Sequence, residues 1–217
     1  MTRKERFAEI SKQLELTFPQ AEYELHFQSP YQLLVAITLA ARCTDQLVNE
    51  LTPSFFLLYP TLQALSSASQ EKLLPLIAPV THAEAKAQYL IDAAKAVMER
   101  FNGKIPTNEI DLMKLPGIGR KSANALLAHA LGQPAIVVDT HVARVSQRLK
   151  IASCNTPDGI ERELTHLIDR QRWIVESNRL TLLGRRICTY YAPQCNLCPV
   201  AKICQTPIEE NHQLSLF

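Results

Sequence analysis

The sequence lacks a long apolar run. Its longest apolar stretch, residues 33–41, is interrupted by Thr38, and no stretch of about 18 apolar residues occurs. The first six residues lead into an amphipathic segment, where a secretion signal would have an apolar core. We therefore expect no membrane-spanning helix and no secretion signal, and we expect the protein to work in the cytoplasm.

A strong net charge is also lacking. The sequence has 23 Lys and Arg against 21 Asp and Glu, which gives a net charge of +2. Such a balance permits binding to a polyanion without requiring it, so local basic patches determine whether the protein binds one. Internal repeats and low-complexity segments are absent as well. The 217 residues allow one large domain or two small ones, and a hydrophobic fraction of 47% suffices for a packed core.

Patterns typical of β-strands are almost absent. The one strand-like run, residues 135–138, has no convincing partner. Apolar residues recur instead at helical spacing, as they do at Phe7, Ile10 and Leu14. The fold class predicted from the sequence is therefore all-α. Further helices are predicted over residues 31–41, 45–55, 62–65, 71–77, 83–101, 112–115, 120–131, 139–149, 158–167 and 173–187.

Four of the six cysteines lie close together near the C-terminus, with the spacing C-x6-C-x2-C-x5-C. An all-sulfur set suits zinc or an iron–sulfur cluster. Structural zinc usually takes two CxxC pairs, and only one is present, so the spacing favours an iron–sulfur cluster. Disulfides are the alternative, which a cytoplasmic location disfavours. The four candidate ligands are Cys188, Cys195, Cys198 and Cys204.

The other two cysteines, Cys43 and Cys154, stand apart from this set. A cysteine outside a metal site commonly behaves as a small apolar residue. We therefore expect both to be reduced thiols in the core.

A second motif, Leu-Pro-Gly-Ile-Gly-Arg-Lys, occupies residues 115–121. Gly117 and Gly119 would allow a tight turn between two helices, with Ile118 packed into the core beneath it. Amide N–H groups at the start of the second helix would bind a nucleic-acid phosphate without reading sequence, and Arg120 would add a charge. The alternative is a plain helical hairpin without a ligand.

Lys121 follows this turn, just inside the second predicted helix. The positive end of the helix dipole and the neighbouring Arg120 both disfavour an ammonium there. A neutral amine is the form that a Schiff-base nucleophile needs. The alternative is a solvated lysine that contacts phosphate.

Asp139 stands where an apolar pair, Val137 and Val138, leads into another predicted helix. A half-buried carboxylate near an amine can take its proton or stabilise a developing cation. Asp139 can also cap the helix, and the two roles are compatible. His141, two residues further on, is expected to be structural.

Together, residues 115–121, the Val-Asp-Thr-His run at 138–141 and the cysteine spacing resemble the endonuclease III family of DNA repair glycosylases, over roughly residues 25–205. The resemblance implies a helix-hairpin-helix glycosylase fold with a 4Fe–4S cluster. It places a six-helix domain over residues 22–132. A cluster domain would comprise residues 1–21 and 133–207, followed by a flexible tail over residues 208–217.

The resemblance also implies a mechanism. A damaged base is flipped out of double-stranded DNA, and Lys121 attacks C1′ of its sugar and displaces the base. The resulting Schiff base permits β-elimination, which nicks the strand, and Asp139 assists. The implied substrates are oxidised pyrimidines and abasic sites.

Two segments depart from the family pattern. Where the family usually has Ala-Gln-x-Thr-Asp, residues 41–45 read Ala-Arg-Cys-Thr-Asp. Arg42 would then fill the gap left by the flipped base, or hold a phosphate or the orphaned base. Where the family usually has a Gly-aromatic-Tyr segment, residues 80–83 read Val-Thr-His-Ala, so we expect a different pocket wall.

Basic residues flank the cysteines, and an apolar pentapeptide ends the chain. Arg185 and Arg186 would hold DNA phosphates, unless they form an ordinary solvated face. The last five residues resemble the short peptide with which bacterial proteins bind the sliding clamp, although such a tail can also fold onto its own protein. The residues expected to contact the clamp are Gln213, Leu214, Leu216 and Phe217.

The sequence thus predicts a monomeric, nucleoid-associated repair enzyme with glycosylase and lyase activity. One alternative is a monofunctional glycosylase for another base. A second is a non-catalytic DNA-binding sensor built around the cluster. Lys121 together with Asp139 argues against the sensor, which needs neither.

Overall fold

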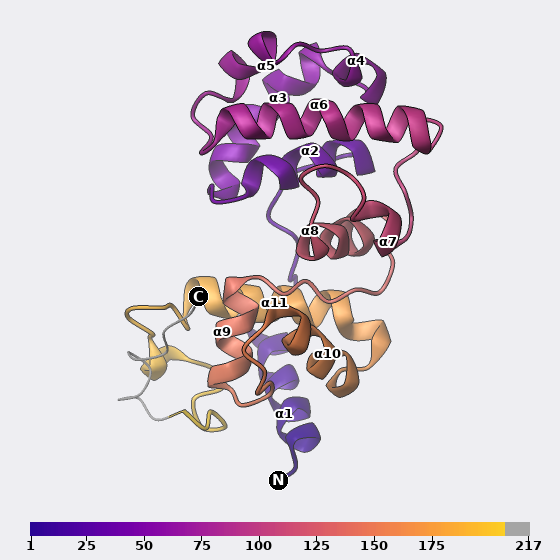
Figure 1. The fold of residues 1–217 in the computed structure, drawn as a ribbon. Coiled ribbons are helices and arrows are strands. Elements are labelled where there is room, and N and C mark those ends of the chain that lie inside the picture. The colour runs from indigo at the N-terminus through magenta and orange to yellow at the C-terminus, as the bar shows by residue number, and fades with distance from the viewer. Residues whose placement is uncertain (207–217) are drawn as a thin grey trace. The chain divides into compact units, whose positions relative to one another are not determined.

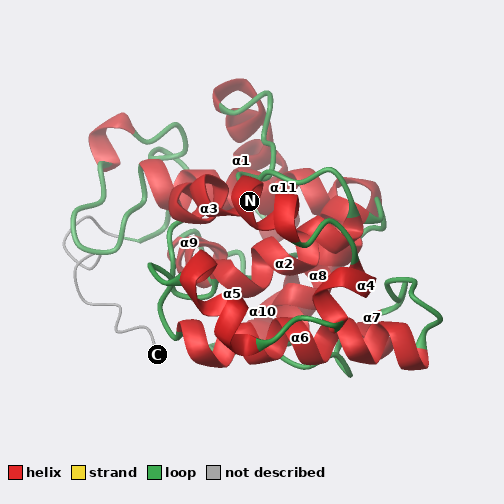
Figure 2. Cartoon of the chain, turned by 90° about the horizontal axis from the view of Figure 1, so that it is seen from above, coloured by secondary structure: helices red, strands yellow, loops and turns green. Residues whose placement is uncertain are grey.

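The computed structural model describes residues 1–206, and within them it contains helices and loops but no strand (Figures 1 and 2). The prediction of an all-α fold is confirmed. The helices are α1 (Arg3–Thr17), α2 (Pro30–Ala40), α3 (Asp45–Leu58), α4 (Leu62–Ser66), α5 (Gln70–Ile77), α6 (Ala83–Arg100), α7 (Glu109–Leu112), α8 (Arg120–Ala125), η1 (Leu126–Ala130), α9 (Thr140–Arg148), α10 (Pro157–Leu167), η2 (Arg170–Arg172), α11 (Trp173–Arg186) and η3 (Cys195–Leu197).

The chain divides into two compact units. The hairpin unit is Tyr23–Gln133, and the cysteine unit is Met1–Glu22 together with the described part of Pro134–Phe217. The tail expected over residues 208–217 lies outside the described residues. Within residues 1–206, none of the helices combines the length and the apolar content that crossing a bilayer requires.

The hairpin unit is built around α2 and α6. Helix α2 begins at Pro30, and the hydroxyl of Ser29 caps it by accepting a hydrogen bond from the backbone of Gln32. Its residues from Leu33 to Leu39 are all buried, so it forms the centre of the unit. Helix α6 packs against α2 on one side and against α4 and α5 on the other (Figure 1).

The cysteine unit packs α1, α9, α10 and α11 around an apolar core, and a buried carboxylate links two of these helices. Glu176 of α11 is fully buried, and its Oε1 accepts hydrogen bonds from Ser11 Oγ at 2.8 Å, Arg172 Nη2 at 2.6 Å and Arg179 Nη1 at 3.0 Å. A buried charge is tolerated when it is paired in this way. Since Ser11 lies on α1, the network ties the N-terminal helix to α11.

Two elements differ from their predicted form. Helix α7 spans Glu109–Leu112 instead of residues 112–115, because the side chain of Asn108 caps it by accepting from the backbone of Asp111. The helix predicted over residues 120–131 is α-helical only to Ala125. It continues as the π-helical turn η1, whose C-cap residue Leu131 donates to the Leu126 carbonyl.

We predict that Glu176→Ala lowers the free energy of unfolding by about 3–5 kcal/mol, because the buried Arg179 guanidinium then keeps only the half-exposed carboxylate of Glu15, at 3.5 Å, as an ionic partner. Urea denaturation measures this loss. Glu15→Ala is the matched control: Glu15 binds the same two arginines, but its side chain is 52% exposed, so the expected loss is much smaller. Equal losses for the two variants would contradict the role given to Glu176.

Candidate active site

The turn between α7 and α8 depends on Gly117. Its φ is +78°, and a Cβ added there would lie 3.0 Å from Cβ and Cγ of Tyr89 on α6. Ile118 is 5% exposed, which confirms its predicted packing beneath the turn. Gly119 caps α8, and a Cβ there would meet no atom within 4 Å. The backbone at the start of α8 therefore faces open space.

Lys121 is the second residue of α8, and its side chain is exposed. Its neighbour Arg120 is half-buried and forms an ion pair with Glu109 of α7, at 2.6 Å between Nη1 and Oε1. The pair braces α7 against α8 across the turn. The turn thus presents the Lys121 amine at the surface while the Arg120 guanidinium is held by a carboxylate.

Asp139 lies in the cysteine unit, whereas Lys121 lies in the hairpin unit. Buried residues from Ala135 to Val138 lead to Asp139, whose Oδ1 accepts from the backbone of Val142 at 2.7 Å. The capping role predicted for Asp139 is confirmed. The cap fixes one oxygen of this half-buried carboxylate at the start of α9.

Helix α9 is held tightly against α11. A Cβ added to Gly184 would lie 2.8 Å from His141 Cβ, so only glycine permits this approach. Arg144 donates to the Gly184 carbonyl at 2.7 Å and to the Cys188 carbonyl at 3.0 Å. These contacts fix the helix that carries Asp139.

His141 lies beside Arg144, with 3.2 Å between His141 Nδ1 and Arg144 Nη2. Burial lowers the pKa of His141, and the carboxylate of Asp139 opposes part of the shift. The imidazole is therefore neutral at pH 7, and its Nδ1 accepts from the guanidinium. The packing against Gly184 and Arg144 accords with the structural role expected of His141.

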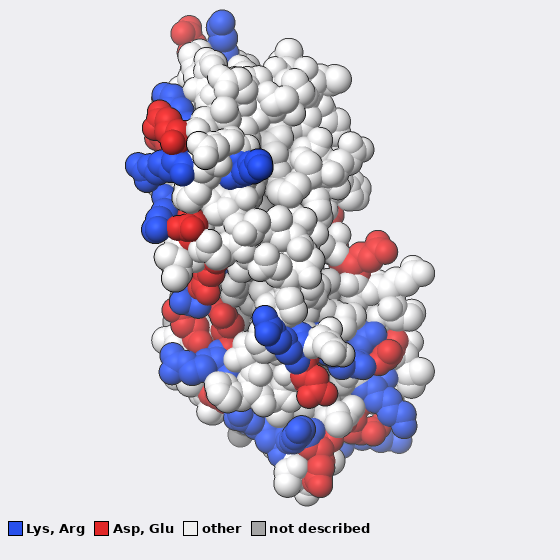
Figure 3. Space-filling model, turned by 90° about the vertical axis from the view of Figure 1, so that its right-hand side faces the viewer, with Lys and Arg blue, Asp and Glu red and all other residues white. Residues whose placement is uncertain are grey.

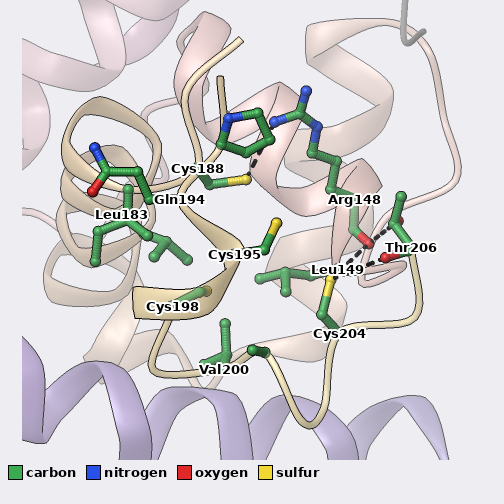
Figure 4. A pocket seen from close by; sticks show the side chains of 13 residues that line it. Arg148, Leu149, Leu183, Cys188, Gln194, Cys195, Cys198, Val200, Cys204 and Thr206 are labelled. Atoms are coloured by element: carbon green, nitrogen blue, oxygen red, sulfur yellow. Dashed lines mark hydrogen bonds between the residues drawn. The ribbon is translucent and has the colours of Figure 1, made fainter. Parts of the chain in front are cut away.

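The four clustered cysteines line one cavity of about 90 Å³ (Figure 4). Arg148 of α9 is 1% exposed and contributes to the same wall. Its Nη1 donates to Cys188 Sγ at 3.4 Å and to the Thr189 carbonyl at 2.7 Å, and its Nη2 donates to the Tyr190 carbonyl at 3.1 Å. The guanidinium thereby organises the start of the cysteine loop, residues 188–204.

The donor chemistry of this cavity fits an iron–sulfur centre. All four cysteines are free thiols, which excludes the disulfide alternative in this structure. Burial raises the pKa of Cys198 to about 11 and also raises the pKa of Cys204, and the neighbouring cysteines add to both shifts. Thiolates crowded in this way need a positive centre among them. Within residues 1–206, however, no three His, Cys, Asp or Glu side chains already stand as a metal-binding group.

Cys43 and Cys154 are both free thiols, as predicted, but each is only half-buried: Cys154 packs against the core of the cysteine unit, whereas the prediction of a core position for Cys43 is wrong. Cys43 lies in the turn that follows α2. Cys154 lies in the loop before α10, where Gly159 packs so closely that a Cβ added to it would lie 2.7 Å from Cys154 Cβ. Both cysteines therefore lie in loops and not in the buried face of a helix.

Arg42 is exposed in the turn after α2, with a φ of +60° that is uncommon for a residue with a side chain. Arg185 and Arg186 lie in the last turn of α11. The Arg186 guanidinium stands 5.9 Å from the centre of the Phe18 ring. Gln213, Leu214, Leu216 and Phe217 lie outside the described residues.

Charged side chains of both signs intermingle on the face shown in Figure 3, in keeping with the small net charge. If a polyanion binds on that face, individual charged side chains contribute more to its recognition than a positive electrostatic potential spread over the whole surface.

Within residues 1–206, sequence reasoning missed five buried cations: Arg6, Lys86, Arg144, Arg148 and Arg179. A signal was present for two of them. Arg144 and Arg148 are four residues apart, so they share one face of α9, and that helix packs against α11. A pair of arginines on a packed helix face predicts buried carbonyl or anion partners.

The sequence and the fold are similar to those of known proteins. Residues 35–170 match the model of the HhH-GPD superfamily of base excision DNA repair proteins. The chain is 39% identical to an endonuclease III from Synechocystis sp. over 94% of this chain and 93% of that protein. It is 38% identical to an endonuclease III from Bacillus subtilis, over 87% and 86%.

A solved structure described as a trapped endonuclease III–DNA covalent intermediate superposes with a TM-score of 0.90. That chain is 34% identical, and the match covers 94% of this chain and 97% of the other.

Proposed function

The chain belongs to the endonuclease III family, within the HhH-GPD superfamily of base excision DNA repair proteins, and we propose that Lys121 is the nucleophile with which it acts on DNA. Its fold is the predicted helix-hairpin-helix glycosylase fold, and its activity is that of a DNA glycosylase and abasic-site lyase. The observation that carries the proposal is the exposed amine of Lys121 directly after the Gly117–Gly119 turn.

In the proposed reaction, the neutral amine of Lys121 forms a bond to C1′ of the flipped nucleotide. The bond between C1′ and the base breaks, and the base leaves with the bonding electrons and takes up a proton. Opening of the sugar gives a Schiff base between Nζ and C1′. Loss of a proton from C2′ then breaks the bond between C3′ and its phosphate oxygen, which nicks the strand.

Asp139 would assist from the start of α9. Its carboxylate takes the proton that Lys121 must lose before attack, or stabilises the cationic sugar that develops as the base departs. One oxygen is held by the Val142 amide, so the carboxylate is oriented before substrate arrives. The contacts of α9 with Gly184 and Arg144 preserve that orientation.

DNA would be held chiefly by backbone amides of residues 117–119 at the start of α8. Arg120 is paired with Glu109, so we assign it the bracing of the turn as well as the phosphate contact predicted from the sequence. Arg185 and Arg186 would add phosphate contacts at the end of α11. The substrates we propose are duplexes with oxidised pyrimidines or abasic sites.

A 4Fe–4S cluster would be held by Cys188, Cys195, Cys198 and Cys204. When bound, it supplies a rigid, positively charged centre that crosslinks the cysteine loop, and base removal requires no redox chemistry from it. The cavity shared by the four thiols and the hydrogen bond from Arg148 to Cys188 Sγ support this assignment.

We further propose that the protein is a monomer, that it works at the nucleoid because its substrate is chromosomal DNA, and that residues 213–217 bind the bacterial sliding clamp. A second candidate activity, monofunctional base removal, is favoured only by Arg42 and the Val80–Ala83 segment, where the sequence differs from the family pattern.

We predict that Lys121→Ala abolishes borohydride trapping on an abasic or thymine-glycol duplex, together with strand nicking, because no amine then attacks C1′. DNA affinity should fall only slightly, since backbone amides provide much of the grip. Lys114→Ala is the control, because Lys114 is an exposed lysine seven positions before Lys121 that pairs with Asp111. Undiminished nicking by Lys121→Ala would rule out this mechanism.

We predict that the pure protein is yellow-brown and contains about four iron atoms per chain. Cys198→Ala should lose the colour and most of the iron, while Cys43→Ser and Cys154→Ser should retain both. Metal analysis and the visible absorbance spectrum measure this. One zinc per chain without iron, in protein prepared anaerobically, would reject the cluster.

We predict that Arg42→Ala slows base excision by about tenfold or more but slows cleavage of a ready-made abasic site much less, because an abasic nucleotide is easier to extrude. Single-turnover rates on matched duplexes give the comparison. Equal losses on both duplexes, with a weaker salt dependence of binding, would make Arg42 a plain phosphate contact.

We predict that deletion of residues 213–217 abolishes binding to the sliding clamp but leaves nicking of short duplexes unchanged. The full-length protein should bind the clamp with an affinity on the order of micromolar, since a pentapeptide buries few atoms. Surface plasmon resonance on immobilised clamp tests this, and binding that survives the deletion would refute the assignment.

A further inference from the structure

Three non-glycine residues of the hairpin unit, Arg42, His82 and Asn102, have the uncommon left-handed backbone conformation. Arg42 follows α2 with a φ of +60°, and His82 precedes α6 with a φ of +56°. Left-handed backbone at residues with side chains is costly and persists where surrounding contacts enforce it.

Lys86, in the first turn of α6, is 5% exposed and points its ammonium at the end of α2. Its Nζ donates to the Leu39 carbonyl at 2.8 Å, to the Ala41 carbonyl at 2.5 Å and to Cys43 Sγ at 3.6 Å. The last carbonyls of a helix lack intrahelical partners and carry negative partial charge. The buried cation therefore closes the end of α2 and contacts the residues on both sides of Arg42.

Thr81 holds the same turn from the segment before α6. Its backbone N–H donates to Cys43 Sγ at 3.4 Å, and its hydroxyl lies 3.2 Å from that sulfur. The hydroxyl also donates to the carbonyl of Arg42 itself at 3.1 Å. Lys86 and Thr81 together thus contact the turn at Ala41, Arg42 and Cys43.

The ionisation of this cluster agrees with its geometry. Burial lowers the pKa of Lys86, and Cys43 opposes the shift. Burial of Cys43 would raise the pKa of its thiol, but hydrogen bonds from Thr81 and the charge of Lys86 outweigh it, so the pKa is lowered. The sulfur is thus a good acceptor for both partners.

We propose that Lys86 and Thr81 are positioning residues for Arg42. They fix the backbone of residues 41–43, in which Arg42 is left-handed, and so direct the exposed Arg42 side chain toward the gap that the flipped-out nucleotide leaves in the duplex. This proposal rests on the function proposed above for Arg42. It assigns specificity for damaged bases over abasic sites to two residues that themselves need not touch DNA.

Thr81→Val tests the proposal with little risk to folding, because Thr81 is exposed and valine has the same shape. The variant loses the hydroxyl contacts to Arg42 and Cys43. We expect the ratio of single-turnover rates, thymine-glycol excision over abasic cleavage, to fall about tenfold, as the loss of one or two hydrogen bonds implies. Thr81→Ser, which keeps the hydroxyl, should retain the wild-type ratio.

The same substitution in an Arg42→Ala background shows whether Thr81 acts through Arg42. If it does, Thr81→Val causes no further loss there. Lys86→Met, with thermal unfolding to verify its fold, should lower the ratio in the same non-additive way. An unchanged ratio in Thr81→Val, or full additivity with Arg42→Ala, would overturn the proposal.

The outcomes separate this proposal from the proposed function. If Arg42→Ala lowers the ratio and Thr81→Val does not, the positioning role is wrong and the function of Arg42 stands. If Arg42→Ala leaves the ratio unchanged, the role of Arg42 is wrong and the positioning role falls with it.

Discussion

Close approach at two glycines is the constraint on which both units depend. In the hairpin unit, Gly117 adopts positive φ against Tyr89, so the chain can turn and begin α8 one residue before Lys121. In the cysteine unit, Gly184 lets α11 contact α9 at His141, near the cap residue Asp139. Each glycine removes a Cβ that would push apart the elements carrying a reactive group. The proposed chemistry therefore begins with backbone geometry.

Buried cations complete the framework by binding irregular backbone. Arg144 and Arg148 donate to carbonyls at the start of the cysteine loop, and Lys86 donates to carbonyls at the end of α2. A loop without regular hydrogen bonds leaves carbonyl groups in need of donors. A long cationic side chain can reach several of them from a neighbouring helix, which holds the loop without making it helical.

Local sequence patterns predicted what local interactions determine. Helical apolar spacing gave the all-α class, and the glycines at 117 and 119 gave the turn with Ile118 beneath it. The cysteine spacing brought four thiols to one cavity. Sequence reasoning missed the π-helical turn at Leu126–Ala130 and the Arg120–Glu109 pair. It also missed the partners of Lys86 and the half-buried position of Cys43. Tertiary contacts and helix geometry determine these features, and apolar spacing does not encode either.

The proposed chemistry requires the Lys121 amine, which follows the Gly117–Gly119 turn, to form the covalent bond to DNA. Mass spectrometry of peptides from the borohydride-reduced protein–DNA adduct tests this most directly, because it locates the modified residue in the unaltered protein. We expect the sugar remnant to lie on Lys121. A remnant on the N-terminal amine, or on another lysine such as Lys86, would contradict it.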